Sequence, residues 1–337
     1  MELPTQSSLN IGPRKLLDYP EYFHRLLRCL ETSISSISTD PVFLQQQLEL
    51  FEHAKANEKA ILLSLTEDVF GNLGEESPRI LLEHIFISFG AQCSHEQTFK
   101  IIAAYIRQFS IQIDLQARAL CVDDLQNLLL EETKHMSDTL NMLSKRFEKI
   151  DGPIRSHLME AGKTAPLSKT FDIYAAGVRQ SMQMIRQASK SYGANCDPYQ
   201  CDYLNDSCTL LCVHASMQSL STQLWRLASD LRLRATGPRG GFKEIILPAV
   251  APGSSIMPGK LNPVMAEMVY STSDQVDANH ASMSMAIKSG WLESAASSGI
   301  ILRNFIESSR LLRRTIRSFT DKCLVGVVPN TKNRVIS

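Results

Sequence analysis

Residues 210–231 read LLCVHASMQSLSTQLWRLASDL, and their large apolar side chains recur at alternating spacings of three and four residues. The residues in this seam are Leu210, Val213, Met217, Leu220, Leu224, Leu227 and Leu231. The spacing places them along one side of an α-helix, as in a coiled coil. The pattern therefore predicts a long helix whose apolar seam packs along another long helix.

Similar apolar stripes occur in other parts of the chain. They run from Met136 to Ile150, from Phe171 to Ile185 and from Ile301 to Phe319. A further helix is expected to start at Pro263 and to run toward Lys288. Convincing strand alternation is not found. The chain is therefore predicted to be all-α, with long antiparallel helices in a bundle.

The first part of the chain has a different character. Its shorter helical patterns are interrupted at Pro13, Pro20, Pro41, Gly71, Gly74, Pro78 and Gly90. Proline and glycine commonly end or delimit helices. We therefore expect a smaller, irregular helical region over residues 1–110 and a central helical bundle over residues 111–337.

The composition and the net charge argue against some classes of binding partner and indicate a cellular location. The 337 residues are 44% hydrophobic, and 35 basic residues balance 35 acidic ones. A net charge of zero argues against nucleic acid or an anionic membrane as the main partner. The N-terminus shows no apolar signal core, no apolar run has bilayer length, and the eight cysteines are scattered. A protein of the reducing cytoplasm is expected.

Residues 253–263 read GSSIMPGKLNP and are the most informative stretch for function. Two hydroxyl side chains follow a glycine, and a lysine and an amide come next. Asn262 is a good N-cap and Pro263 is tolerated at a first helical position. The run therefore predicts a polar loop that leads into a helix N-terminus, which is a favourable place for an anion.

This run resembles the signature G-S-S-x-M-P-x-K-x-N-P of the aspartase/fumarase superfamily. Residues 229–233 (SDLRL) and 236–241 (TGPRGG) resemble its D-L-R and S-G-P-R-x-G runs. Residues 278–280 (ANH) stand where the aspartate ammonia-lyase and class II fumarase branch reads G-N-D. The resemblance covers residues 208–328. It implies a central five-helix bundle, a tetramer, and sites built from three segments that three subunits contribute.

The resemblance also implies an activity. It is the anti elimination of ammonia, water or an amine from a succinyl-type substrate, or the reverse addition, with fumarate or a related product. Ser254 matches the general base, Lys260 and Asn262 match the residues that bind a carboxylate, and Ser255 is a further substrate-binding candidate. Negative charge grows on that carboxylate as the proton leaves, so preorganised donors matter there. The chemistry requires no cofactor and no metal.

Three other residues near the signature have supporting roles by resemblance. Gly253 permits backbone movement of the loop, and Met257 belongs to the same signature. Glu267 matches a glutamate that pairs with a histidine from another subunit in fumarases. An ordinary acidic residue favoured by the helix dipole is the alternative interpretation of Glu267.

The other two family segments depart from the pattern. Residues 162–167 (GKTAPL) are the nearest match to G-R-T-H/Q-L-Q-D, with Thr164 as a substrate-contacting candidate and Ala165 where His or Gln is usual. The first segment, S-S-N-D-T or S-G-T-x-x-N-M-N, is not found. The alternative hypothesis is therefore a catalytically inactive homologue. It would bind a dicarboxylate or join a paralogous subunit and donate its Ser254 loop.

Cysteines and histidines outside the signature indicate no metal site. Cys208 and Cys212 lie about one helical turn apart, and with their neighbours they match no common zinc pattern. We expect them to be buried thiols of a bundle helix. His135 and His157 are possible acid/base groups of the bundle, but solvated positions on helices are the favoured interpretation for both.

Overall fold

The computed structural model is mostly helical, which confirms the all-α prediction. Its described residues are 20–35, 41–58, 60–61, 78–92, 96–192, 203–237, 240–251, 257, 262–289 and 298–331. Among the helices in these ranges, none combines the length and the apolar composition that crossing a bilayer requires.

The chain divides into two compact units, each made of separate stretches of sequence. Unit 1 comprises residues 1–122, 193–208 and 285–304, and unit 2 comprises residues 123–192, 209–284 and 305–337. Helix α6 (Glu96–Phe147) contributes residues to both units. The predicted division near residue 110 falls inside α6 and stays a prediction.

Unit 1 contains three short helices that pack on one another. They are α1 (Pro20–Ser35), α2 (Pro41–Ala56) and α5 (Pro78–Gln92). Each begins at a proline, because proline is tolerated in the first turn but interrupts a helix interior. Buried Gln47 on α2 donates to the carbonyl of Glu31 at 2.9 Å and to Ser35 Oγ at 2.7 Å, which ties α2 to α1.

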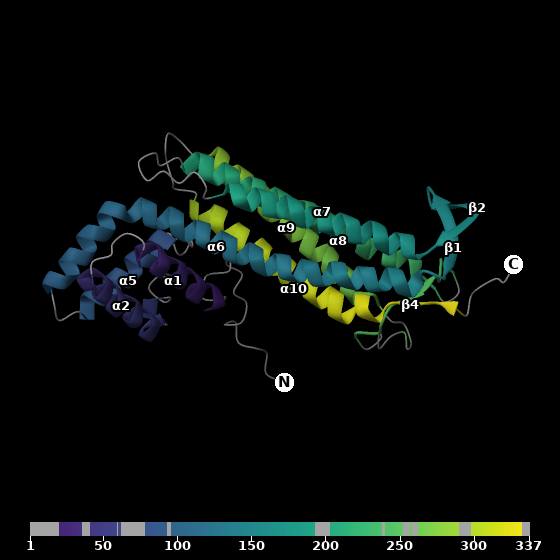
Figure 1. Ribbon diagram of the computed structural model, residues 1–337, viewed down its shortest axis with the longest axis horizontal. Coiled ribbons are helices and arrows are strands. Elements are labelled where there is room, and N and C mark those ends of the chain that lie inside the picture. The colour runs from purple at the N-terminus through teal and green to yellow at the C-terminus, as the bar shows by residue number, and fades with distance from the viewer. Residues whose placement is uncertain are drawn as a thin grey trace. The chain divides into compact units, whose positions relative to one another are not determined.

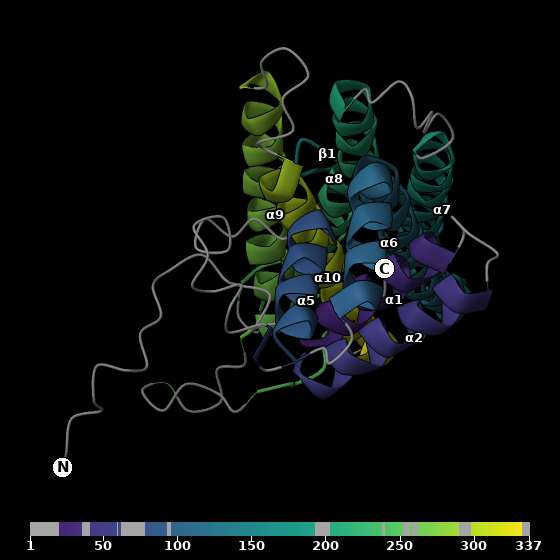
Figure 2. The same cartoon turned by 90° about the vertical axis from the view of Figure 1, so that its left-hand side faces the viewer.

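Unit 2 contains the predicted bundle. Its helices are α6, α7 (Ser168–Ser191), α8 (Tyr203–Arg234), α9 (Val264–Lys288) and α10 (Ser298–Lys322), and consecutive helices run in opposite directions (Figure 1). Helix α8 lies between α7 and α9 (Figure 2). Hydrogen bonds also join α8 to the other two helices. Gln126 on α6 donates to Met217 of α8, and His214 of α8 bonds with Ser308 on α10.

The apolar stripes form the core of the bundle. All seven seam residues of α8 are at most 1% exposed. At one end of the bundle the ring of Phe147 on α6 packs on Phe171 of α7, with centroids 4.9 Å apart. Burying each large apolar side chain contributes roughly 1.5–3 kcal/mol, so these stripes supply much of the stability.

Two small antiparallel sheets occur at the end of the bundle where α6 and α8 finish. A hairpin pairs β1 (Asp151–Ser156) with β2 (Met159–Pro166), and β3 (Ile245–Ile246) pairs with β4 (Val328–Pro329), which follows the short helix η3 (Leu324–Gly326). Sequence patterning did not predict these strands. Most hairpin side chains are exposed on both faces, so no apolar alternation marks them.

A polar network is buried inside the bundle. His214 on α8 contacts His280 Nδ1 on α9 through its own Nδ1 at 3.1 Å and Ser308 Oγ on α10 through Nε2 at 2.8 Å. Asn279 Nδ2 donates to the same Ser308 oxygen at 3.0 Å. Burial, together with the nearby His280, lowers the pKa of His214 to about 3. Burial also lowers the pKa of His280, although Asp277 opposes that shift.

Candidate functional site

The catalytic candidates of the signature fall outside the described residues. This applies to Gly253, Ser254, Ser255 and Lys260. The chain is described up to residue 251 on one side and from residue 262 on the other. Met257 is described alone and is 50% exposed. The structure therefore defines the two stems of the signature run, and the roles of the four residues stay predictions.

The stem after the run leads directly into α9. The carbonyl of Pro263 accepts hydrogen bonds from the N–H groups of Ala266 at 2.9 Å and Glu267 at 3.2 Å, and the helix is assigned from Val264. Asn262 is exposed and precedes the capping position by one residue, a small offset from the expected cap. The predicted start of a helix directly after the signature run is confirmed, and the predicted polar loop itself falls outside the described residues.

Glu267 lies on the first turn of α9 and is exposed. Its carboxylate forms no ion pair with a described residue, and only its backbone carbonyl accepts a bond, from Ser271 Oγ at 3.3 Å. The carboxylate therefore lies exposed at the start of α9.

Thr164 lies in strand β2 of the hairpin, opposite Pro153, and its side chain is exposed. Ala165 pairs with Gly152 in the same ladder. No hydrogen bond between described residues joins Thr164 to Asn262. The hairpin and the start of α9 nevertheless lie at the same end of the bundle. Arg155 of β1 and Arg234 in the last turn of α8 bind the same carboxylate, that of Glu244. Arg232, also in the last turn of α8, lies over the ring of Tyr270 in α9.

The stem before the signature run is held by ion pairs. Glu244 directly precedes β3, and its carboxylate accepts from Arg155 of β1 and from Arg234 at the end of α8. Sequence analysis missed this cluster. Arg155 lies far from Glu244 along the chain, so no local pattern links the two residues. The sequence signal for this cluster was that Glu244 lies within the run that resembles the family.

A tight turn leads to Glu244 and accounts for Gly241 of the TGPRGG run. Gly241 has φ +86°, and a Cβ at this position would lie 2.1 Å from Thr236 Oγ1. That oxygen accepts the N–H of Phe242 at 3.0 Å, and Lys243 N–H donates to the Thr236 carbonyl at 3.1 Å. Only glycine fits this close approach without strain.

A second polar pair links α7 and α8 near the same end. Tyr174 Oη donates to Asp230 Oδ2 at 2.5 Å, and Asp230 belongs to the SDLRL run. Burial, and then the bond to Asp230, raises the pKa of Tyr174 far above its usual value. Tyr174 therefore stays protonated, and its hydroxyl group donates to Asp230 and orients that carboxylate.

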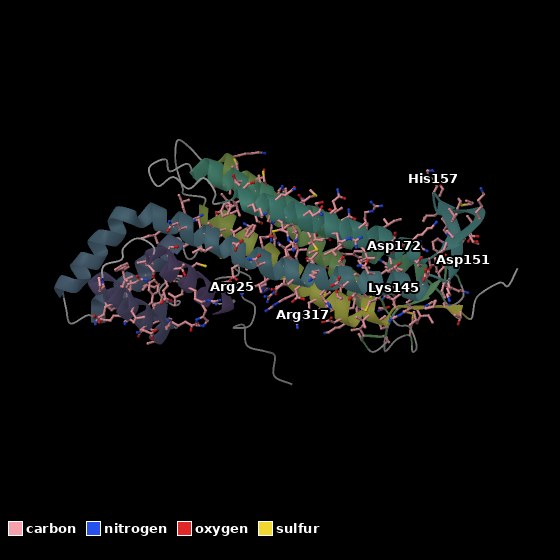
Figure 3. All side chains as sticks on the ribbon, viewed as in Figure 1. Arg25, Lys145, Asp151, His157, Asp172 and Arg317 are labelled. Carbon is pink, nitrogen blue, oxygen red and sulfur yellow. The ribbon has the colours of Figure 1, made fainter. Side chains whose placement is uncertain are left out.

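The other histidines and cysteines occupy structural or surface positions. His135 contacts Asp321 at 2.9 Å, with both side chains half exposed. His157 is exposed at the turn of the hairpin and points away from the bundle (Figure 3). Both histidines are solvated as expected, but the predicted helix position is wrong for His157. The prediction of buried thiols is wrong for Cys208 and Cys212, which are exposed because they lie opposite the apolar seam of α8. No group of metal ligands gathers in the described part of the chain.

Comparisons with known proteins agree with these features. A family model described as lyase matches residues 193–277, which include the whole signature run. Class II fumarate hydratase of Halalkalibacterium halodurans and aspartate ammonia-lyase of Bacillus subtilis are each 31% identical over 61% of this chain. The alignments cover 52% and 51% of those proteins, so the chain spans about half of their length.

The matched segment, residues 193–277, belongs to the fumarate lyase family. The fold of the chain resembles the crystal structure of a fumarate lyase:delta crystallin protein from Brucella melitensis, with a TM-score of 0.69. That match has 21% identity and covers 91% of this chain and 78% of the other. The fumarate lyase fold thus extends well beyond the signature segment.

Proposed function

We propose that the protein is a lyase that eliminates ammonia, water or an amine from a succinyl-type substrate, or catalyses the reverse addition. The observation that carries this proposal is the complete run 253–263, which directly precedes the N-terminus of α9. Family membership supports the reaction class, and relatives named as fumarate hydratase and aspartate ammonia-lyase support a dicarboxylate substrate.

In the proposed mechanism, Ser254 removes a proton from the carbon beside a carboxylate. The C–H electrons move into that carboxylate to form an aci-carboxylate. They then form the C=C bond as the leaving group departs with the electrons of its C–N or C–O bond. Lys260 and Asn262 hold the carboxylate and stabilise its growing charge. The dipole of α9 adds to this stabilisation and helps an otherwise weak serine base.

The remaining site candidates assist this arrangement. Ser255 and Thr164 would contact the substrate, and Thr164 is accessible on the exposed hairpin. Gly253 and Met257 would shape the loop. The open carboxylate of Glu267 would receive a group from a neighbouring subunit.

The substrate site is proposed to require a homotetramer. Large apolar side chains of the bundle remain exposed in the single chain, including Met142 on α6, Ile173 on α7 and Trp225 on α8. Ile173 is 69% exposed, which association would cover. The scattered cysteines favour a reducing, cytoplasmic location.

A catalytically inactive homologue is the second candidate. Ala165 supports it, because this residue supplies neither the imidazole nor the amide that relatives use at the matching position. In this case the protein would bind a dicarboxylate, or would join a paralogous subunit and donate its Ser254 loop.

A screen of purified protein for fumarate formation from a panel of succinyl compounds tests the proposal. Turnover that disappears in Ser254→Ala, with unchanged folding, is the expected result. Light scattering on the same sample should give a tetramer. A stable monomer contradicts the assembly, whereas an inactive tetramer favours the second candidate. Activity gained only on mixing with a complete paralogue supports the donated loop.

A further inference from the structure

Glu244 joins several elements at the end of the bundle. Its Oε1 accepts from Nη1 of Arg155 in β1, and its Oε2 accepts from Nη1 of Arg234 in α8. Its N–H donates to the carbonyl of Arg234 at 2.8 Å, and its carbonyl accepts the N–H of Asn330 at 3.0 Å. Both carboxylate oxygens and both backbone polar groups of Glu244 are therefore bonded.

The two arginines extend these bonds to further elements. The guanidinium of Arg155 lies 3.9 Å from the ring centroid of Phe242, and its Nη2 donates to Glu160 Oε1 of β2 at 3.1 Å. Arg234 Nη2 donates to Thr170 Oγ1 in the first turn of α7 at 3.1 Å. One carboxylate thus connects the hairpin, α7, α8 and the segment that leads into β3.

The environment makes the Glu244 pairs stronger than ordinary surface ion pairs. The Glu244 side chain is 8% exposed, whereas the Glu160 side chain, which binds the same arginine, is 63% exposed. Water screens the Glu160 pair, and exposed pairs of this kind contribute little. Removing the Glu244 charge would leave two guanidinium groups without their shared anion.

We propose that Glu244 is a positioning residue that holds the hairpin carrying Thr164 and the stem entering residues 253–263 in one fixed arrangement. Ser254, the proposed base, follows this stem in the sequence. For its catalytic consequence the inference rests on the proposed function. Proton transfer requires reacting atoms in near-attack geometry, and small misplacements cost much of the rate.

Hydrogen exchange measures the positioning role without any need for activity. Glu244→Gln keeps the size of the side chain but removes its charge, and Glu160→Gln removes the exposed partner of Arg155 as a matched control. In Glu244→Gln, exchange should rise roughly tenfold or more in both residues 151–166 and residues 243–251, because charged hydrogen bonds are lost. The control should retain the exchange of the unaltered protein.

Kinetics then test the link to the site. If the elimination activity exists, Glu244→Gln should lower kcat by roughly tenfold or more. Its KM should rise as well, because the hairpin that carries the proposed substrate contact Thr164 is no longer held in place. A variant that is only less stable would contain fewer folded molecules, but each folded site would keep its kcat. Circular dichroism measures the folded fraction and so distinguishes this case from a true loss of kcat.

Each outcome decides one claim. Unchanged exchange in either segment of Glu244→Gln overturns the inference, as does an equal increase in Glu160→Gln. If Glu244→Gln does not fold, Arg155→Gln releases only the hairpin arm, and unchanged exchange in residues 151–166 overturns the inference. Absence of turnover in the unaltered protein rejects the proposed function, while the exchange result still decides whether Glu244 couples the two segments.

Discussion

The buried His214 should make the stability of the protein depend on pH. In the folded protein its pKa is lowered from 6.5 to about 3, because the side chain is buried and faces His280. Its two nitrogens contact His280 Nδ1 and Ser308 Oγ. The unfolded chain therefore binds a proton at this histidine over a range of pH in which the folded chain does not.

The sign and size of the effect follow from these pKa values. The stabilising contribution is fully present above pH 6.5 and is lost as the pH falls toward 3. Each pH unit within this window is worth about 1.4 kcal/mol for one proton. Lowering the pH from 7.5 to 5 should therefore reduce the free energy of unfolding by about 2 kcal/mol through His214 alone.

Urea denaturation at pH 7.5 and pH 5, on the unaltered protein and on His214→Gln, isolates this contribution. The loss of stability between the two pH values should be about 2 kcal/mol smaller in the variant. An identical pH dependence in the unaltered protein and His214→Gln would refute a neutral, buried His214.

Three further substitutions test other parts of the molecule. Lys260→Met should weaken dicarboxylate binding roughly 10-fold to 150-fold, the equivalent of losing a charge-assisted contact, and equal affinities by calorimetry would contradict the assigned carboxylate site. Gly241→Ala should lower the free energy of unfolding by about 1–3 kcal/mol, since its φ is +86°, and an unchanged urea midpoint would disprove the tight turn. Phe147→Ala should cost about 3–5 kcal/mol, because the ring is fully buried against Phe171, and a loss below about 1 kcal/mol would contradict that packing.

The long helices could be predicted because their signal is local. The seam from Leu210 to Leu231 and the stripe from Phe171 to Ile185 are buried as the spacing indicated. The predicted helix after Pro263 begins at Val264 and ends at Lys288. The hairpin over residues 151–166 was not predicted, since its side chains face water on both sides and carry no periodic signal.

The chemistry of the candidate site was also suggested by sequence, through the order of Ser254, Lys260 and Asn262 in one short run. The roles of these residues stay predictions. The exposure of Cys208 and Cys212 differs from the expectation of buried thiols, although the helical spacing of the seam already places both on the opposite side of α8.

The sequence by itself determined the helical bundle and the position of the signature run before α9, because these depend on residues that are close along the chain. Only the tertiary structure decided that Arg155 shares Glu244 with Arg234, and that the buried His214 contacts the partly exposed His280. These contacts depend on which helices are neighbours and on their register, and no local pattern encodes either. Burial then sets the strength of the ion pairs and the pKa of the histidine.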